Sequence, residues 1–423
     1  MTHFALICPP LPSHIRVFRT LGATLVARGH HVTLLLPEGA ERETHAGPVQ
    51  TVTFGAQAGR KACLALREGA RHPTGALGVL RTVRDSARLT AILCESGPDI
   101  LSRIGADAVL ADQMEPAGGL IARHLGLPYL SIASALPIER EPALPPPFLD
   151  WPYDPSPDGL KRSRGAERVT RFVLRRQRRV IEDMALRFGL PGIAMLEDCI
   201  SPLATISQTV AAFDFPRAAA PRLHAVGPIR KETVPDVRLP FAYDPNRPLV
   251  YCSFGTLQGH RLAMFQIVAK AAAALDMQLV IAHCGGLSEA EAASLDAHHV
   301  AAHLPERAVL KAADICVTHG GLNTVMDALG AGVPLLVLPI AFDQPGIAAR
   351  VEHHGVGLKL SRVHLSERTA RSSLRRLIVE KGFGERARAL GSRIGAGGGA
   401  RLAADIIESQ TIGARAPAGE LLA

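Results

Sequence analysis

Apolar residues in the first half of the chain follow two alternating patterns. Short apolar runs with the length of strands are separated by longer segments with apolar residues at helical spacing, as in Val17, Leu21 and Leu25. The runs predict strands at 3–8, 31–36, 49–54, 108–111 and 129–133, with helices at 15–27, 75–95 and 116–125. Strands that alternate with helices predict a parallel sheet covered by helices on both faces.

The second half of the chain repeats this alternation. Its predicted strands lie at 249–254, 278–282, 300–303, 315–318 and 335–338. Its predicted helices lie at 261–275, 307–313, 322–329, 345–353, 366–380 and 385–409. We therefore expect an α/β protein with two Rossmann-like domains whose parallel sheets face each other across a cleft. Ligands bind in such a cleft, at the carboxyl ends of the strands.

A proline-containing segment without periodicity separates the two halves. This composition is typical of a linker, which we place at 229–247. The predicted N-terminal domain is then 1–228, and the predicted C-terminal domain is 248–395. Residues 396–423 form a C-terminal helix and tail, which we expect to pack back on the N-terminal domain.

The net charge of the 423-residue chain comes from one segment. The chain has 47 basic and 39 acidic residues, a net charge of +8. The segment 161–179, from Lys161 to Arg179, contains nine basic residues and one acidic residue, Glu167. Apolar residues recur through it at helical spacing, which predicts an amphipathic helix with a basic face. Such a helix suits an anionic membrane surface. The aromatic content of 4% argues against stacking on nucleic-acid bases.

The sequence also indicates in which cellular compartment the protein is expected. No apolar run approaches the ~20 residues of a membrane-spanning helix, and the N-terminal run is too short for a signal peptide. The seven cysteines form no C-x-x-C pair and no zinc-binding spacing. We expect a cytoplasmic protein with reduced thiols and no metal site, peripheral to the inner face of the membrane through the basic segment.

The segment around His319 has the composition of an anion-binding turn. A predicted strand ends just before His319, and a predicted helix begins a few residues later. Gly321 lets the backbone approach a ligand closely, and Asn323 and Thr324 add donors beside free N–H groups at a helix N-terminus. The ring of His319 is placed to donate to a phosphate.

Acidic and amide side chains beyond this turn suit a sugar nucleotide. Asp327 lies one turn along the same predicted helix, where its carboxylate can accept from ribose hydroxyls. Asp343 and Gln344 follow the next predicted strand, where their polar atoms can hydrogen-bond a sugar.

Together these residues resemble the nucleotide-sugar signature of family-1 glycosyltransferases, which have the GT-B fold. The positions that match in type and order are His319, Gly321, Asn323, Thr324, Asp327, Gly332, Val333, Pro334, Asp343 and Gln344. About sixty residues upstream, the strand end with Ser253, Gly255 and Thr256 resembles the family's loop that meets the diphosphate. The resemblance therefore implies a UDP-sugar donor.

Two positions depart from the plant form of the signature. Asp327 stands where that form has a longer Glu. No Trp lies near the position at which the plant enzymes stack a ring on uracil, and His303 or Leu304 falls closest to it.

The resemblance also implies a catalytic base in the N-terminal domain. In the family, a His between the first strand and the first helix deprotonates the acceptor hydroxyl, and His14 occupies that place. Asp112 ends a predicted strand on the same edge and would orient His14, with Asp99 and Asp107 as alternatives. The chain has no Asp-x-Asp pair for a metal-bound diphosphate. We therefore expect inverting, metal-independent transfer without a cofactor.

Further segments are similar to bacterial zeaxanthin glucosyltransferases, a narrower group of this family. They include residues 9–10, 13–14, 25–30, 201–204, 213–217, 226–228 and 339–346. The similarity implies transfer of glucose from UDP-glucose to the hydroxyls of zeaxanthin, a step of carotenoid biosynthesis. The alternatives are a UDP-glycosyltransferase for another hydrophobic alcohol, such as a macrolide, a flavonoid or a lipid, and a GT-B-fold UDP-sugar epimerase. Sequence does not fix the oligomeric state.

Overall fold

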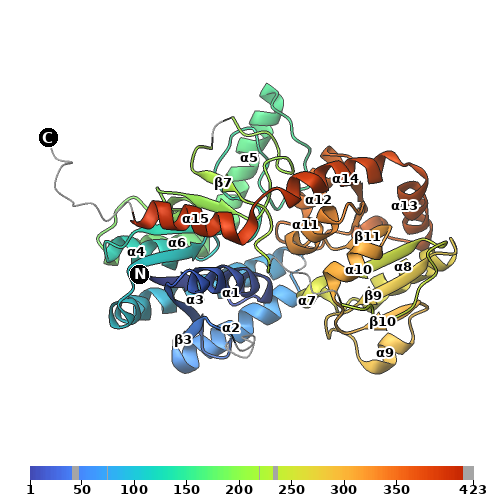
Figure 1. Ribbon diagram of the computed structural model, residues 1–423. Helices are drawn as coiled ribbons and strands as arrows, with labels where there is room; N and C mark the ends of the chain where they lie inside the picture. The colour runs from blue at the N-terminus through green and yellow to red at the C-terminus, as the bar shows by residue number, and fades with distance from the viewer. Residues whose placement is uncertain (41–46, 74, 219, 232–236, 413–423) are drawn as a thin grey trace.

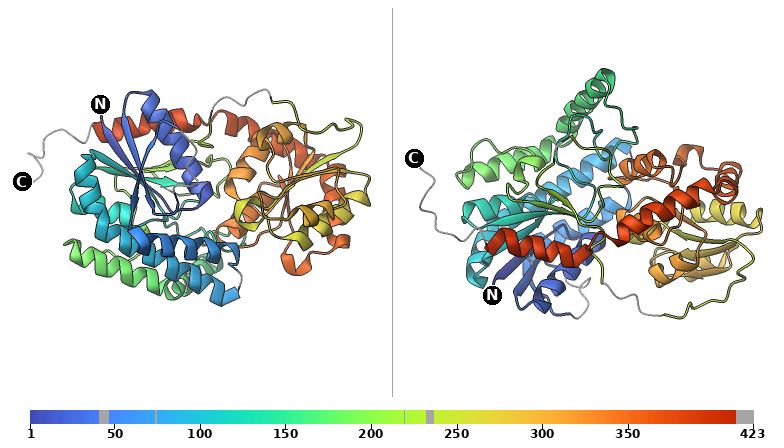
Figure 2. Two further views of the ribbon diagram at one scale, coloured as in Figure 1. Left: turned by 90° about the horizontal axis from the view of Figure 1, so that it is seen from below. Right: turned by 45° about the horizontal axis from the view of Figure 1, so that its top comes forward.

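Two parallel sheets, each covered by helices on both faces, form the two halves of the protein (Figure 1 and Figure 2). This computed structural model describes residues 1–40, 47–73, 75–218, 220–231 and 237–412. Residues 232–236 of the predicted linker and 413–423 of the predicted tail lie outside the described residues.

The first sheet has the strand order β3-β2-β1-β4-β5-β6-β7. Its strands are β1 (His3–Ile7), β2 (His31–Pro37), β3 (Gln50–Phe54), β4 (Ala108–Asp112), β5 (Tyr129–Ala133), β6 (Thr205–Ser207) and β7 (Leu223–Ala225). The helices of this half are α1 (Pro12–Ala27), α2 (Ala56–Arg71), α3 (Gly75–Ile104), α4 (Ala117–His124), α5 (Pro157–Val173) and α6 (Arg175–Arg187), with a short 3-10 turn at Leu196–Cys199.

The second sheet has the strand order β10-β9-β8-β11-β12-β13. Its strands are β8 (Leu249–Ser253), β9 (Gln278–Ala282), β10 (His299–Ala301), β11 (Ile315–Thr318), β12 (Leu335–Val337) and β13 (Gly357–Lys359). Its helices are α7 (Gly255–Gln258), α8 (Leu262–Ala273), α9 (Glu289–Ala293), α10 (Glu306–Ala312), α11 (Leu322–Gly330), α12 (Gln344–His353), α13 (Glu367–Val379) and α14 (Gly382–Gly395), with a 3-10 turn at Arg362–His364.

The strand order places a switch point in the middle of each sheet. In the first sheet β1 pairs with both β2 and β4, and in the second β8 pairs with both β9 and β11. The loops after β1 and β4 therefore diverge to opposite faces and leave a crevice between them, as do the loops after β8 and β11. Each half thus has a crevice at its carboxyl edge, where ligands bind in sheets of this topology.

The last helix of the described residues, α15 (Gly399–Ile412), returns to the first half, where it lies along α1 (Figure 1). Its residues Ala403 and Ile407 are fully buried in the core that β1 and α1 share. At the end of α1, Arg28 is 2.7 Å from Asp405 and 2.8 Å from Glu408. These contacts tie the C-terminal helix to the N-terminal sheet.

A buried ion pair joins the two halves near the cleft. Asp214, in the connection between β6 and β7, is 2.7 Å from Arg350 of α12, and both side chains are almost fully buried. Burial alone would raise the pKa of Asp214, but the charges of Arg350 and Arg217 outweigh it and lower that pKa. The neighbouring Phe213 is fully buried in the core of the second half.

Two predicted helices are in fact two helices each. The basic segment 161–179 spans the end of α5 and the start of α6, which meet at Leu174. The predicted helix 385–409 is divided between α14 and α15, where Gly398 takes a φ of 80°. A left-handed residue of this kind ends a helix. The prediction also missed α2, the short helices α7 and α9, and the three-residue strands β6, β7 and β13.

No helix within the described ranges has the length and apolar character needed to span a bilayer.

Candidate active site

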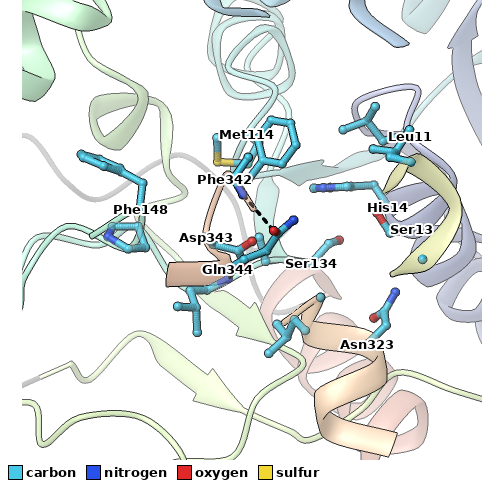
Figure 3. Close-up of a pocket in the computed structure, with 18 of the residues that line it drawn as sticks. Leu11, Ser13, His14, Met114, Ser134, Phe148, Asn323, Phe342, Asp343 and Gln344 are labelled. Carbon is cyan, nitrogen blue, oxygen red and sulfur yellow. Dashed lines mark hydrogen bonds between the residues drawn. The ribbon is translucent and has the colours of Figure 1, made fainter. Parts of the chain in front are cut away.

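A cavity of about 1260 Å³ lies between the carboxyl edges of the two sheets (Figure 3). Of the fourteen residues predicted for the site, thirteen line it. They are His14, Ser253, Gly255, Thr256, His303, Leu304, His319, Gly321, Asn323, Thr324, Asp327, Asp343 and Gln344. The fourteenth, Asp112, lies behind His14.

His14, in the first turn of α1, is held by the carboxylate that ends β4. Its Nδ1 is 2.7 Å from Oδ2 of Asp112, whose side chain is fully buried. The other oxygen of Asp112 accepts a hydrogen bond from the backbone N–H of Met114 at 2.9 Å. The two side chains meet because β1 and β4 are adjacent parallel strands. Of the alternative aspartates, Asp107 accepts from the backbone N–H of His3 at the strand entry, and Asp99 is exposed on α3.

The pKa of His14 is raised above the usual 6.5 of histidine. Burial is the largest influence and acts to lower this pKa, because it disfavours the charged ring. The charge of Asp112 and its hydrogen bond act in the opposite direction, and Asp343 of the other half adds to them. Together these groups outweigh burial, so the protonated ring is stabilised.

His319, after β11, has the opposite electrostatic environment. Burial lowers its pKa to about 4, although a backbone hydrogen bond with Ser253 opposes the shift. A Cβ at Gly255 would lie 2.8 Å from Cε1 of the His319 ring, and a Cβ at Gly321 would lie 2.7 Å from the same atom. Any side chain larger than that of glycine at either position would therefore collide with the ring of His319. Because its pKa is lowered to about 4, that ring is neutral at physiological pH.

The loop after β8 positions its polar atoms partly through its own hydrogen bonds. The hydroxyl of Ser253 donates to the carbonyl of Ala282 at 2.9 Å and accepts from the backbone N–H of Gly255 at 3.3 Å. Ser253 thus shapes the turn, while Thr256 lines the cavity beside it. Gly255 has a φ of 69°, which a residue with a side chain rarely adopts.

Arg230, which the sequence analysis assigned only to a linker, contacts two of the predicted site residues. Its Nη2 donates to Oδ1 of Asn323 at 2.9 Å, and its Nε is 3.4 Å from Asp327. Its Nη1 also donates to Oε1 of Gln208, and the amide of Gln208 donates to the carbonyl of Ser134. Arg230 therefore connects the start of α11 to a loop of the first half. In the sequence, the only indication of these contacts is that Arg230 lies between the two predicted domains.

A second residue missed from the sequence is Glu306, at the start of α10. Burial and the charge of Asp327 raise its pKa, and a hydrogen bond with Thr324 opposes them. Among the described residues, its Oε1 is buried without a hydrogen-bond partner. Nearby, His303 is exposed on the cavity wall, whereas Leu304 packs against the core.

Asp343 and Gln344 approach the first half from the start of α12 (Figure 3). Oδ2 of Asp343 accepts from the backbone N–H of Leu136 at 3.1 Å, and burial raises the pKa of the carboxyl. Oε1 of Gln344 accepts from the N–H groups of Ile340 and Ala341. The amide oxygen is thereby oriented towards its own loop, which leaves the NH₂ group as the donor for a ligand.

The wall of the cavity in the first half is largely apolar. Its apolar side chains come from α2, α3, α5 and the loops after β4 and β5, and include Leu66, Val79, Val83, Met114, Leu136, Ile138, Phe148, Val173 and Leu174. The cavity therefore has one polar end, at the second sheet, and one apolar side, at the first.

The chain is similar to known glycosyltransferases over its whole length. Residues 183–394 match the family model described as UDP-glucoronosyl and UDP-glucosyl transferase. A zeaxanthin glucosyltransferase of Pantoea ananas is 38% identical over 96% of both chains. That of Pseudescherichia vulneris is 38% identical over 98% of this chain and 99% of its own.

Among solved structures, the calicheamicin glycosyltransferase CalG4 superposes with a TM-score of 0.76 at 22% identity. The superposition covers 99% of this chain and all of CalG4, so the two share the GT-B fold. The chain belongs to the UDP-glycosyltransferase family, and it is an enzyme with two parallel-sheet halves facing across the cleft that holds its cavity.

Proposed function

We propose that this enzyme transfers glucose from UDP-glucose to the hydroxyl groups of zeaxanthin, a step of carotenoid biosynthesis. The observation that carries the proposal is the 38% identity to two proteins named zeaxanthin glucosyltransferase, each matched over nearly its full length. The apolar side of the cavity supports it, because a long apolar alcohol needs such a wall.

In this proposal His14 is the general base that activates the acceptor. Its Nδ1 is occupied by Asp112, so Nε2 is the ring nitrogen left to take the hydroxyl proton. The acceptor oxygen then forms a bond to C1 of glucose as the bond from C1 to the diphosphate breaks. Asp112 orients the ring and stabilises its protonated form. A single displacement of this kind inverts the configuration at C1.

The second half holds the donor. Asp343 and Gln344 hydrogen-bond the glucose hydroxyls, and Asp327 accepts from the ribose. The N–H groups at the start of α11, with Asn323, Thr324 and Thr256, bind the diphosphate. His319 donates to it as a neutral ring, since burial lowers its pKa to about 4. His303, which is exposed on the wall, covers the uracil. Transfer proceeds without a metal ion.

The acceptor is taken from a membrane surface through the segment 161–179. Figure 2 shows α5 projecting from the rest of the molecule. Val169 and Phe172 of α5 have 64% and 66% of their surface exposed, between arginines that are also exposed. Val169 also lines the cavity, as do Val173 and Leu174. The helix thus combines a basic surface, exposed apolar side chains and one wall of the acceptor cavity.

The pH dependence of kcat/KM tests the role of His14. Because the base must be unprotonated, we expect kcat/KM to fall on acidification with an apparent pKa above 6.5. In Asp112→Asn the burial of His14 remains, but the negative charge that raises its pKa is lost. The pKa of His14 therefore falls, and the acid limb of the profile moves to lower pH. The control Asp99→Asn, an exposed position on α3, leaves the limb in place. An acid limb at the same pH in Asp112→Asn would contradict the assignment.

Product analysis tests the reaction itself. Purified enzyme with UDP-glucose and zeaxanthin in detergent should give zeaxanthin glucosides by mass spectrometry, with UDP-galactose and UDP-GlcNAc as competing donors. His14→Ala should bind UDP-glucose like the wild type but form glycoside about 10²–10⁴-fold more slowly. His31→Ala is the matched control, since this exposed ring lies outside the cavity lining.

The same assay separates the alternatives. Glucosides of another hydrophobic alcohol, with none of zeaxanthin, would overturn the acceptor and leave the transferase activity intact. An epimerised sugar nucleotide after incubation with UDP-glucose alone would instead indicate an epimerase.

Flotation with anionic vesicles tests the membrane contact. Changing Arg164, Arg168 and Arg171 of α5 to Gln should weaken binding by at least about tenfold, because each basic residue near an anionic surface contributes about 1 kcal/mol. The control removes the same charge from α13, with Arg368, Arg371 and Arg375 changed to Gln. Equal binding by the α5 variant and the wild type would refute the contact.

A further inference from the structure

One face of α1 points across the cleft towards the second half. Ser13, Arg16 and Thr20 line the cavity and are spaced i, i+3 and i+7, which places them on one side of the helix. Figure 3 shows His14 and Ser13 on the side of the cavity opposite Asp343, with Asn323 below them. Arg16 follows His14 by two residues, so one helix turn carries the proposed base and a guanidinium.

The guanidinium of Arg16 has no partner of its own. Its side chain is exposed, and among the described residues it makes neither a hydrogen bond nor an ion pair. Other arginines of this region are engaged: Arg19 of α1 donates to the hydroxyl of Thr51 at 3.0 Å, and Arg28, just after α1, pairs with α15. A long cationic side chain directed into a cavity and left unpaired is available to a ligand.

The groups that Arg16 faces belong to the second half. Burial raises the pKa of the Cys284 thiol, just after β9, and of the Glu306 carboxyl, at the start of α10, and the positive charge of Arg16 opposes both shifts. Cys284 in turn shares hydrogen bonds with Ser253 and Thr256 of the loop after β8. Arg16 therefore lines the same cavity as the loops that surround the proposed diphosphate position, near enough for its charge to act on them.

Three basic side chains beside that position, those of His319, Arg230 and Arg307, offer it little free positive charge. His319 is neutral, because burial lowers its pKa to about 4. Arg230 is held by Asn323 and Asp327, and Arg307 donates to the carbonyl of Lys231. The N–H groups of α11 contribute partial charges only. A departing diphosphate gains negative charge, and a formal positive charge stabilises it most.

We propose that Arg16 binds the diphosphate of the donor and stabilises the UDP leaving group. This inference rests on the proposed function. When the bond between C1 and the β-phosphate oxygen breaks, both electrons remain on that oxygen, and Arg16 donates its N–H groups to the phosphate without transferring a proton. The N-terminal half thus supplies both the base that takes the acceptor proton and the charge that balances the product UDP.

Calorimetric binding of uridine, UMP and UDP separates this role from a structural one. Arg16→Gln should weaken UDP about 10- to 100-fold, as expected for loss of a charge-assisted hydrogen bond, and leave uridine unchanged. The ratio of UDP to UMP affinity should fall, because the β-phosphate carries the charge that Arg16 meets. In steady state kcat should fall by a similar factor. Arg16→Lys keeps the positive charge but loses the planar guanidinium with its paired N–H donors. Its UDP affinity and kcat should therefore lie between those of the wild type and those of Arg16→Gln.

Arg88→Gln is the matched control, since Arg88 is an exposed arginine of α3 outside the cavity lining. Wild-type affinities and kcat in Arg16→Gln would overturn the inference about Arg16 and leave the proposed function standing. An equal loss of uridine, UMP and UDP binding would also overturn it, because a distorted site weakens all three. If the wild type binds no UDP, the proposed function fails and the role of Arg16 fails with it.

Discussion

The pairing of β1 with β4, and of β8 with β11, determines where the candidate active site of this enzyme lies. Parallel neighbours end at the same edge of a sheet, so the residues that follow them are brought together whatever their separation in sequence. His14 and Asp112 are 98 residues apart in the chain and 2.7 Å apart in space for this reason. In the second half the same pairing sets Gly255 against the ring of His319. The buried pair of Asp214 and Arg350 then joins the two halves beside the cleft.

Two histidines occupy comparable places in the two halves, and their surroundings give them opposite properties. Each follows a central strand at the switch point of its sheet, and each is partly buried in the cavity wall. His14 has a carboxylate on Nδ1, and the charge of Asp112 overcomes burial and raises its pKa. His319 is packed between two glycines without an acidic partner, so burial lowers its pKa to about 4. One ring is suited to accepting a proton, and the other to remaining a neutral donor.

The parts of the fold with strong periodicity could be predicted from the sequence. Strands such as β9 and β11, and helices such as α8, lie close to the predicted ranges because each is a run of buried apolar residues or an amphipathic stripe. Three-residue strands such as β6, β7 and β13 are too short to show a period. The break at Leu174 was missed for a related reason: apolar spacing continues through it, and no proline or glycine marks it.

Residues of the candidate site could be named from the sequence where they belong to a signature, but not where only the tertiary structure brings them together. His319, Asn323 and Asp327 lie within nine positions of one another in a recognisable order. Arg230 contacts two of them from a segment whose composition indicates only a linker. Arg16 is one of many arginines in the sequence, and only the orientation of α1 directs it into the cavity.

In the proposed mechanism, a base on the first half drives one displacement at a sugar that the second half holds. Proton NMR of the purified glucoside tests it most directly, because the coupling constant of the anomeric proton reports the configuration at C1. UDP-glucose carries an α-linked glucose, so the account predicts a β-glucoside. An α-glucoside would contradict it, since retention requires a second displacement or a different mechanism.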